Sequence, residues 1–154
     1  ADTVDGYLNK TVAEDWSALR QEAMALLQEE SGLQEIVSLV GIDALSEKDR
    51  LKLEVAKSIR EDYLQQNGFH EIDTYTSLDK QYKMLKLVLL FRHEAERALD
   101  AGVYLDKVLA LEVRDKIARS KYIHEDDIAK MDDIAAELRA DIDTLINEGG
   151  VLNA

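Results

Sequence analysis

The chain has 154 residues and a formal net charge of −13, from 19 basic and 32 acidic side chains. Such a charge repels phosphate backbones and anionic lipids, so nucleic acids and membrane surfaces are disfavoured as partners and a basic protein is favoured. Cysteine and proline are absent. The first absence excludes disulfides, a thiolate nucleophile and cysteine-bound zinc, and the second is typical of a chain made of long helices.

Apolar residues recur at helical spacing from the beginning of the chain and predict two helices before Gly41. Residues 11–14 fit a capping box, in which a threonine hydroxyl and a glutamate carboxylate each satisfy a free backbone N–H. The apolar stripe that follows predicts a helix that ends near residues 29–32. A shorter helix is expected from residue 33 to about residue 40, with Gly41 as its stop.

A third helix is expected after a polar connection, with Ser46 and Asp49 available to cap its start. Residues 65–70 interrupt the pattern and predict a turn, and the β-branched stretch at 72–76 is expected to be extended or irregular. The inner face of the third helix is predicted to carry Leu51, Val55, Ile59 and Tyr63.

The second half of the chain predicts three longer helices. Ser77 is expected to start the longest, over residues 78–101, with Gly102 as its C-terminal stop. No internal repeat and no long linker divides the sequence. The sequence therefore predicts an all-α protein, a single bundle of about six helices without a β-sheet. The last two helices are expected at residues 104–120 and 125–148, the final one ended by Gly149 and Gly150.

The sequence contains no complete catalytic motif. None of its seven glycines lies in a GxxxxGK[ST] loop, so the chain lacks the usual phosphate-binding loop. Its acidic pairs are neighbours in sequence, and adjacent helical residues point about 100° apart, so they do not form converging dyads. The histidines are far apart and no HExxH is present, so neither a catalytic nor a metal site is predicted. The histidines are His70, His93 and His124.

Two segments have more than one interpretation. Residues 43–49 form a polar loop and helix start between amphipathic helices, which spacing alone explains equally well as an ordinary connection. Residues 64–69 place Gly68 beside Phe69. That pair suits either a helix end whose phenylalanine folds into the core, or a surface where the glycine leaves room for a flat ring and the phenylalanine stacks on it.

Long blocks of the sequence resemble the C-terminal part of the catalytic A subunit of V/A-type rotary ATPases. The resemblance is dense from about residue 11 to residue 91 and looser, but compatible, to the end. The blocks are DWSALR at 15–20, LLQEE at 26–30, LQEIV at 33–37, LVGIDALSEKDR at 39–50, IREDYLQQN at 59–67, DTYTSL at 73–78 and KQYKML at 80–85.

The resemblance implies that residues 1–154 form the helical C-terminal domain of a larger subunit. A β-barrel and a nucleotide-binding domain with its P-loop would precede it in the parent, where ATP or ADP binds with magnesium. The parent would hydrolyse or make ATP coupled to transport of protons or sodium, and the isolated domain would be inactive and bind no cofactor. Its partners would be the B subunits of the head and the central rotor stalk, in a cytoplasmic head peripheral to the membrane and without direct membrane contact.

The resemblance also assigns a rotor contact to the loop of residues 43–49. It matches the acidic loop that reads DELSEED in the related F-type β subunits. The three glutamates of that pattern correspond here to Ala44, Glu47 and Lys48, so one acid is lost and another is replaced by a base. Shape and steric pushing would then suffice for the contact. The rotor-contact residues implied are Asp43, Ala44, Leu45, Ser46, Glu47, Lys48 and Asp49.

A second set of residues matches the family's segment that closes over adenine. These are Gln66, Gly68 and Phe69, with Gly68 where the family usually has alanine. Phe69 would supply a stacking face, which positions the nucleotide and does not catalyse. The alternative function is a free-standing helical adaptor that binds a basic partner, while an independent enzyme that uses acidic residues has little support.

Overall fold

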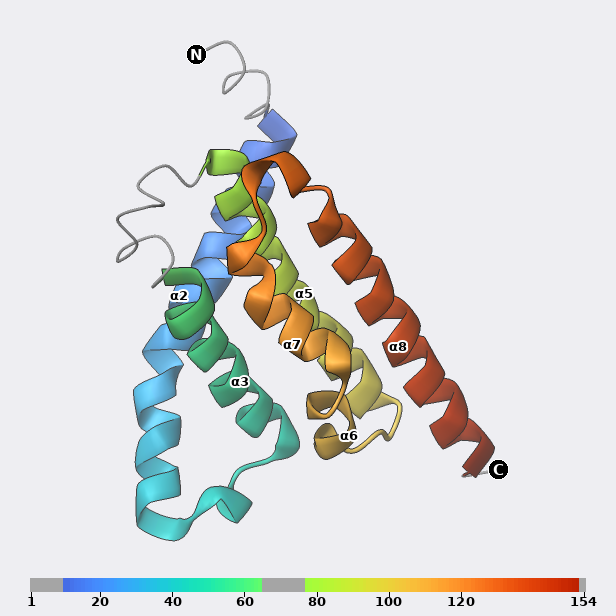
Figure 1. Cartoon of the computed structure of the whole chain (residues 1–154). Helices are drawn as coiled ribbons and strands as arrows, with labels where there is room; N and C mark the ends of the chain where they lie inside the picture. Colours follow the sequence, from blue (N-terminus) through green and yellow to red (C-terminus); the bar gives the residue numbers. More distant parts are fainter. Residues whose placement is uncertain (1–9, 65–76, 153–154) are drawn as a thin grey trace.

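The computed structural model describes residues 10–64 and 77–152 (Figure 1). Within these residues the chain forms six α-helices and no β-strand, which confirms the predicted all-α bundle. None of the described helices is long and apolar enough to cross a membrane. The α-helices are α2 (Lys10–Val40), α3 (Glu47–Ser58), α5 (Leu78–Asp100), α6 (Leu105–Leu109), α7 (Glu112–Arg119) and α8 (Lys130–Leu152).

Shorter helical segments join or extend these helices. A π-helix, η2 (Ile59–Leu64), continues α3 directly. The other segments are 3-10 turns: η1 (Ile42–Ala44) between α2 and α3, and η4 (Ser120–Tyr122) and η5 (Glu125–Asp127) between α7 and α8.

Helix α5 is the centre of the bundle. The α2–α3 hairpin packs on one side of it and α8 on the other, and α7 lies across it (Figure 1). Its apolar residues occupy more than one stripe, which suits a helix covered on several sides. The predicted inner face of α3 is confirmed, because Leu51, Val55 and Ile59 are buried and Tyr63 packs against the core. The buried apolar residues of α5 are Tyr82, Met84, Leu85, Leu87, Val88, Leu89, Phe91, Ala95 and Ala98.

Three predicted helix ends are confirmed. The Ser46 hydroxyl accepts a hydrogen bond from the Asp49 N–H at 3.1 Å and caps α3, while Asp49 itself lies in the first turn. The Ser77 hydroxyl caps α5 in the same way, from the Lys80 N–H at 3.0 Å. Gly102 has a φ of 92° and follows the last turn of α5. Only glycine takes this conformation without strain, so it ends the helix.

Helix α2 differs from its prediction in two places, at its start and at Gly32. Lys10 and Thr11 are already helical, so the capping box at 11–14 is wrong, because a capping residue must itself be non-helical. Gly32 does not end a helix either, and α2 runs through it for 31 residues. A glycine inside a helix costs only about 1 kcal/mol relative to alanine, less than the loss of several helical hydrogen bonds.

The helix predicted at residues 104–120 is broken at Ala110 and Leu111 into α6 and α7. The buried residues explain the break. In one straight helix, the apolar pair of α6 and the apolar pair of α7 would point roughly 130° apart. The bend lets both pairs reach the core. The pairs are Leu105 with Val108, and Val113 with Ile117.

The last helix also differs from its prediction at both ends. Residues 125–127 form the separate turn η5, and α8 begins at Lys130. The pair Gly149 and Gly150 does not end α8, which continues to Leu152. A Cβ added to Gly149 would meet Val103 at 3.8 Å, so this glycine packs against the bundle. The predicted turn at 65–70 and the extended stretch at 72–76 lie outside the described residues.

Candidate functional site

The turn between α2 and α3 contains the predicted rotor contact and forms one end of the molecule (Figure 1). Helix α2 ends at Val40, and Gly41, with a φ of 94°, redirects the chain into η1. A φ in this range favours glycine, so the turn depends on that residue. Ser46 then caps α3 and sets its direction. We call the segment from Val40 to Asp49 the α2–α3 corner.

The seven residues predicted to contact the rotor are not equally accessible. Asp43, Ala44, Ser46 and Lys48 are exposed, whereas Glu47 and Asp49 are half-buried. Leu45 is buried, with 8% of its surface exposed. The corner therefore has an outer surface made by only some of the seven, and Leu45 lies on its inner side.

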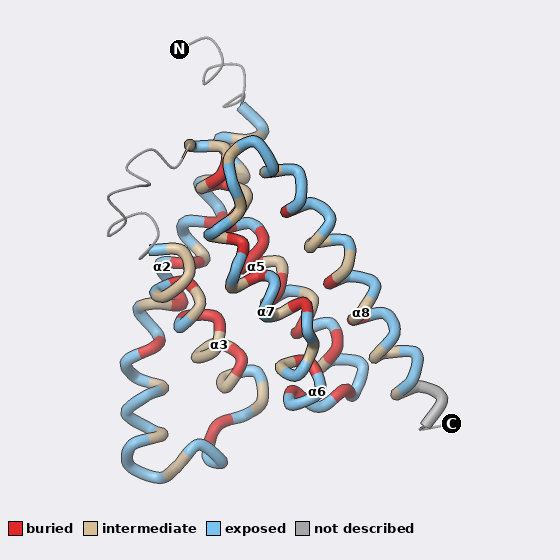
Figure 2. The backbone as a smooth tube through the Cα atoms, viewed as in Figure 1, coloured by how far each residue is buried: buried red, intermediate tan, exposed pale blue. Residues whose placement is uncertain are grey.

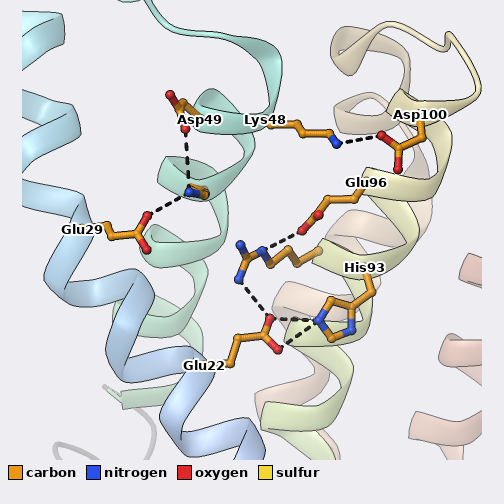
Figure 3. A network of polar contacts seen from close by, with 9 residues as sticks. Glu22, Glu29, Lys48, Asp49, His93, Glu96 and Asp100 are labelled. Atoms are coloured by element: carbon orange, nitrogen blue, oxygen red, sulfur yellow. Dashed lines mark hydrogen bonds and ion pairs between the residues drawn. The ribbon is translucent and has the colours of Figure 1, made fainter.

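Two charged side chains of the corner are bound to other helices. The Glu47 carboxylate accepts a hydrogen bond from the backbone N–H of Leu105, at the start of α6. An anion is favoured there because the first N–H groups of a helix have no partner within the helix. The Lys48 ammonium lies 2.7 Å from Asp100, at the end of α5 (Figure 3). This hydrogen bond raises the pKa of Lys48 above its usual range.

Ion pairs also connect α3 to α2 beside the corner (Figure 3). Lys52 lies 2.9 Å from Glu29 of α2 and 3.8 Å from Asp49 within its own helix. Further along, both Nε and Nη2 of Arg60 donate hydrogen bonds to the carboxylate of Glu30, the shortest at 2.9 Å from Nε and 2.7 Å from Nη2. Because Glu30 is 8% exposed, this pair is partly shielded from solvent. The charges near the corner therefore connect helices to one another.

Beside its exposed polar side chains, the corner and the last turns of α2 also expose several aliphatic side chains. Ile36, Leu39, Val40 and Ile42 are exposed by 41%, 75%, 68% and 42%, and we call these four residues the corner patch. Figure 2 shows this end of α2 largely exposed. The sequence analysis did not select these residues, because an apolar stripe on a helix is expected to face the core. The available signal was their density, because two aliphatic residues directly precede Gly41 and one directly follows it.

A second group of polar contacts joins α2 to α5 nearer the middle of the bundle. Arg92 of α5 lies 3.2 Å from Glu22 of α2 and 2.8 Å from Glu96 (Figure 3). His93 also contacts Glu22, with Nε2 2.9 Å from the carboxylate. These contacts bind α2 to the central helix through a single carboxylate, Glu22.

The residues predicted to contact adenine, Gln66, Gly68 and Phe69, lie outside the described residues. Their described neighbours are Leu64, at the end of η2, and Ser77, before α5. Both neighbours lie away from the α2–α3 corner, toward the other end of the bundle (Figure 1). In the described part of the chain, no group of three or more His, Asp or Glu side chains converges as a metal site.

Comparison with known proteins identifies the family. The model of the C-terminal domain of V and A type ATP synthase matches residues 5–109, which is more than half of the chain. The chain belongs to this family. The resemblance inferred from the sequence blocks is therefore confirmed.

Members of this family with high identity include three clostridial proteins, each called V-type ATP synthase alpha chain. The protein of Clostridium botulinum strain Eklund 17B is 72% identical over 155 residues, which cover 100% of this chain. That of Clostridium perfringens strain SM101 is 75% identical over 148 residues, or 96% of this chain. That of Clostridium botulinum strain Hall is 68% identical over 151 residues, or 98% of this chain. The chain spans only 25–26% of the length of these relatives.

Proposed function

We propose that this domain belongs to the catalytic subunit of a V/A-type rotary ATPase and contacts the central rotor stalk through the α2–α3 corner. The observation that carries the proposal is the corner patch, four exposed aliphatic side chains at one end of a domain of this family. Exposed apolar clusters at the surface of an otherwise charged protein are typical of protein–protein contacts.

The corner patch supports a contact made by shape and apolar packing. Burial of a large aliphatic side chain contributes about 1.5–3 kcal/mol, so Leu39 and Val40 together would provide a substantial part of a contact. The acidic charge of the loop contributes less, because Glu47 caps α6 and Asp49 faces Lys52. In this proposal Asp43, Ala44, Ser46 and the corner patch face the rotor, and Leu45 anchors the turn from inside.

The polar contacts between the corner and the bundle suit the transmission of force. Glu47 and Lys48 bind the corner to α6 and to the end of α5, and Lys52 binds α3 to α2. A closely packed body moves as a unit and does not deform gradually. A displacement of the bundle would therefore displace the corner and whatever rests against it.

The nucleotide side of the proposal concerns Gln66, Gly68 and Phe69. In the parent, ATP with magnesium would bind on a preceding nucleotide-binding domain, and these residues would contact adenine when the helical domain moves inward. A ligand shifts a conformational equilibrium only through contacts that differ between the two states. The B subunits would surround the domain in a peripheral cytoplasmic head. Hydrolysis and product release would reopen the site, and reversed rotation would make ATP.

The rotor contact is tested by charging the corner patch in the assembled enzyme. We expect the double substitution Leu39→Asp and Val40→Asp to uncouple ATP hydrolysis from ion transport, because two carboxylates would have to be buried against the rotor. The measurement is ions transported per ATP hydrolysed in proteoliposomes, with an expected loss of about tenfold or more. The matched control is Met24→Asp, also on α2 and 59% exposed but distant from the corner.

Coupling that survives the double substitution would exclude the corner patch from the rotor contact, whereas equal losses in both variants would indicate a general defect of α2. The adenine contact is tested separately by Phe69→Ala. Loss of the stacking contact between the Phe69 ring and adenine should raise the KM for ATP by about tenfold. An unchanged KM would remove Phe69 from the pocket and leave the rotor contact unaffected.

A further inference from the structure

A groove between α5 and α8 has an apolar floor. The two helices lie side by side (Figure 1), and a hollow of about 220 Å³ lies between them. Leu87 and Met131 close its bottom and are 3% and 2% exposed. Leu90 and Ala135 are half-buried and form its accessible floor. We call this hollow the α5–α8 groove.

The rim of the groove is basic. Lys83 and Lys86 of α5 and Arg139 of α8 line it, together with one acid, Asp132 of α8. Lys83 lies 3.5 Å from the exposed Asp132, and Lys86 lies 3.7 Å from Asp15 and donates a hydrogen bond of 3.2 Å to the Tyr82 hydroxyl. Arg139 is exposed and forms no ion pair with any residue that the structure describes. The lining of this apolar groove therefore has an excess of positive charge, in a chain whose net charge is −13.

The charge pattern differs at the larger hollow among α3, α5 and α7. That hollow has a volume of about 370 Å³, and its lining mixes Glu61, Asp62 and Asp115 with Lys57 and Arg114. With three acids against two bases, that lining has no excess of positive charge. The α5–α8 groove differs, because its lining has three cations against one acid, and the cations lie on both helices beside the apolar strip.

The dimensions of the groove suit a short helix. Its lining runs from residue 82 to residue 90 on α5 and from residue 131 to residue 139 on α8. Eight helical steps correspond to about 12 Å, a little over two turns. An amphipathic helix of that length would lay one apolar stripe on Leu90 and Ala135, as helices do in other apolar grooves.

We propose that the α5–α8 groove binds an acidic amphipathic helix of another protein, whose carboxylates pair with Lys86 and Arg139 on the two sides of its apolar stripe. Opposite charge gives such a contact its specificity, and the apolar floor supplies most of its affinity. The proposal concerns a different face from the rotor contact and does not depend on it.

The test uses the 154-residue chain and two designed peptides. The first peptide is a helix of about four turns with one leucine stripe flanked by glutamates, and the second has lysines in place of the glutamates. Each is titrated into the isotopically labelled protein and followed by amide chemical shifts. We expect the acidic peptide alone to saturate, to shift residues around Leu90 and Ala135, and to bind more weakly as salt is added.

Three variants decide whether the groove is responsible. Arg139→Glu should weaken binding of the acidic peptide by about tenfold, because an attraction becomes a repulsion. Lys57→Glu makes the same change of charge on α3 and should alter binding by less than about twofold. Ala135→Glu places a charge on the floor and should abolish binding. Thermal unfolding followed by circular dichroism identifies any variant that fails to fold.

Several results would overturn the proposal. These are equal binding of both peptides, shifts confined to another face, no saturable binding, or an Arg139→Glu variant that binds as the parent does. Sedimentation provides a further check on the occupant. A dimer of the unmodified chain that Ala135→Glu dissociates would assign the groove to a second copy of this chain and refute the heterologous partner.

Discussion

The centre of the bundle and the α2–α3 corner hold their helices together by different means. Around α5 the helices meet over side chains such as Val88 and Leu89, which are 3% and 0% exposed. At the corner only Leu45 is buried, and the turn is fixed by a serine cap and by long-range polar contacts. A segment without a core of its own can therefore be fixed by polar contacts, while its aliphatic side chains stay exposed and available to a partner.

The sharpest test of this difference compares two leucines. Leu89→Ala should lower the free energy of unfolding by about 2–5 kcal/mol, because it removes a fully buried side chain and leaves a cavity. Leu39→Ala should change it by less than about 0.5 kcal/mol, since Leu39 is 75% exposed. Urea unfolding of the 154-residue chain, followed by circular dichroism, measures both values. Similar losses would show that the corner patch contributes to the core.

The two serine caps allow the same comparison at the level of a single hydrogen bond. Ser46→Ala should cost about 1 kcal/mol, the usual value for loss of a cap. Ser77→Ala should cost about 2 kcal/mol, because the Ser77 hydroxyl also donates to Glu125 at 2.6 Å. Thermal unfolding of the two variants would test this order. A larger loss at Ser46 would mean that the corner stabilises the bundle more than its burial indicates.

The polar contacts of α2 provide a third comparison. Glu30→Gln should lower stability by about 1 kcal/mol, because Arg60 loses a charged acceptor of two hydrogen bonds while remaining partly solvated. Glu35→Gln is the matched control, an exposed glutamate on the same helix, and should have little effect. If the two variants had equal stability in urea, the pair between Glu30 and Arg60 would contribute nothing to holding η2 on α2.

The smallest predicted effect concerns Tyr82 at the start of α5. Burial, together with its hydrogen bond to Asp15, raises the pKa of Tyr82 above its ordinary value of 10. A raised folded-state pKa stabilises the protein below pH 10, and this contribution is lost as the pH rises through the folded-state value. A titration of phenolate absorbance should therefore show a late-ionising tyrosine that disappears in Tyr82→Phe. A late transition that persists in the variant would contradict the assignment.

Local signals in the sequence were sufficient for several features of the fold. Ser46, Ser77 and Gly102 were correctly placed because each helix end depends on a hydrogen bond or a φ angle within a few residues. The same local reasoning failed at Gly32 and Gly149, where a cost of about 1 kcal/mol per glycine is outweighed by continuation of the helix. The break between α6 and α7 also escaped prediction, because it serves packing against helices distant in sequence.

The rotor contact stays a prediction of the sequence, and the sequence did not predict the partners of its side chains. The family resemblance indicated residues 43–49, and the structure places them together at one exposed end. The partners of Glu47 and Lys48, Leu105 and Asp100, lie more than fifty residues away, and no spacing rule predicts such pairs. The corner patch was missed for a related reason, since periodicity identifies an apolar face without showing whether anything covers it.

The unbroken course of α2 through Gly32 has a mechanical consequence. With 31 residues in one helix, its axis is about 46 Å long, and the corner patch lies at its far end. A rotation of only about 5° around its first turn would carry the patch through about 4 Å, roughly three quarters of the height of one helical turn. If α2 ended at Gly32, bending at that break would reduce the displacement of the corner patch. Because α2 continues through Gly32, a slight tilt at one end corresponds to a displacement of several ångströms at the other.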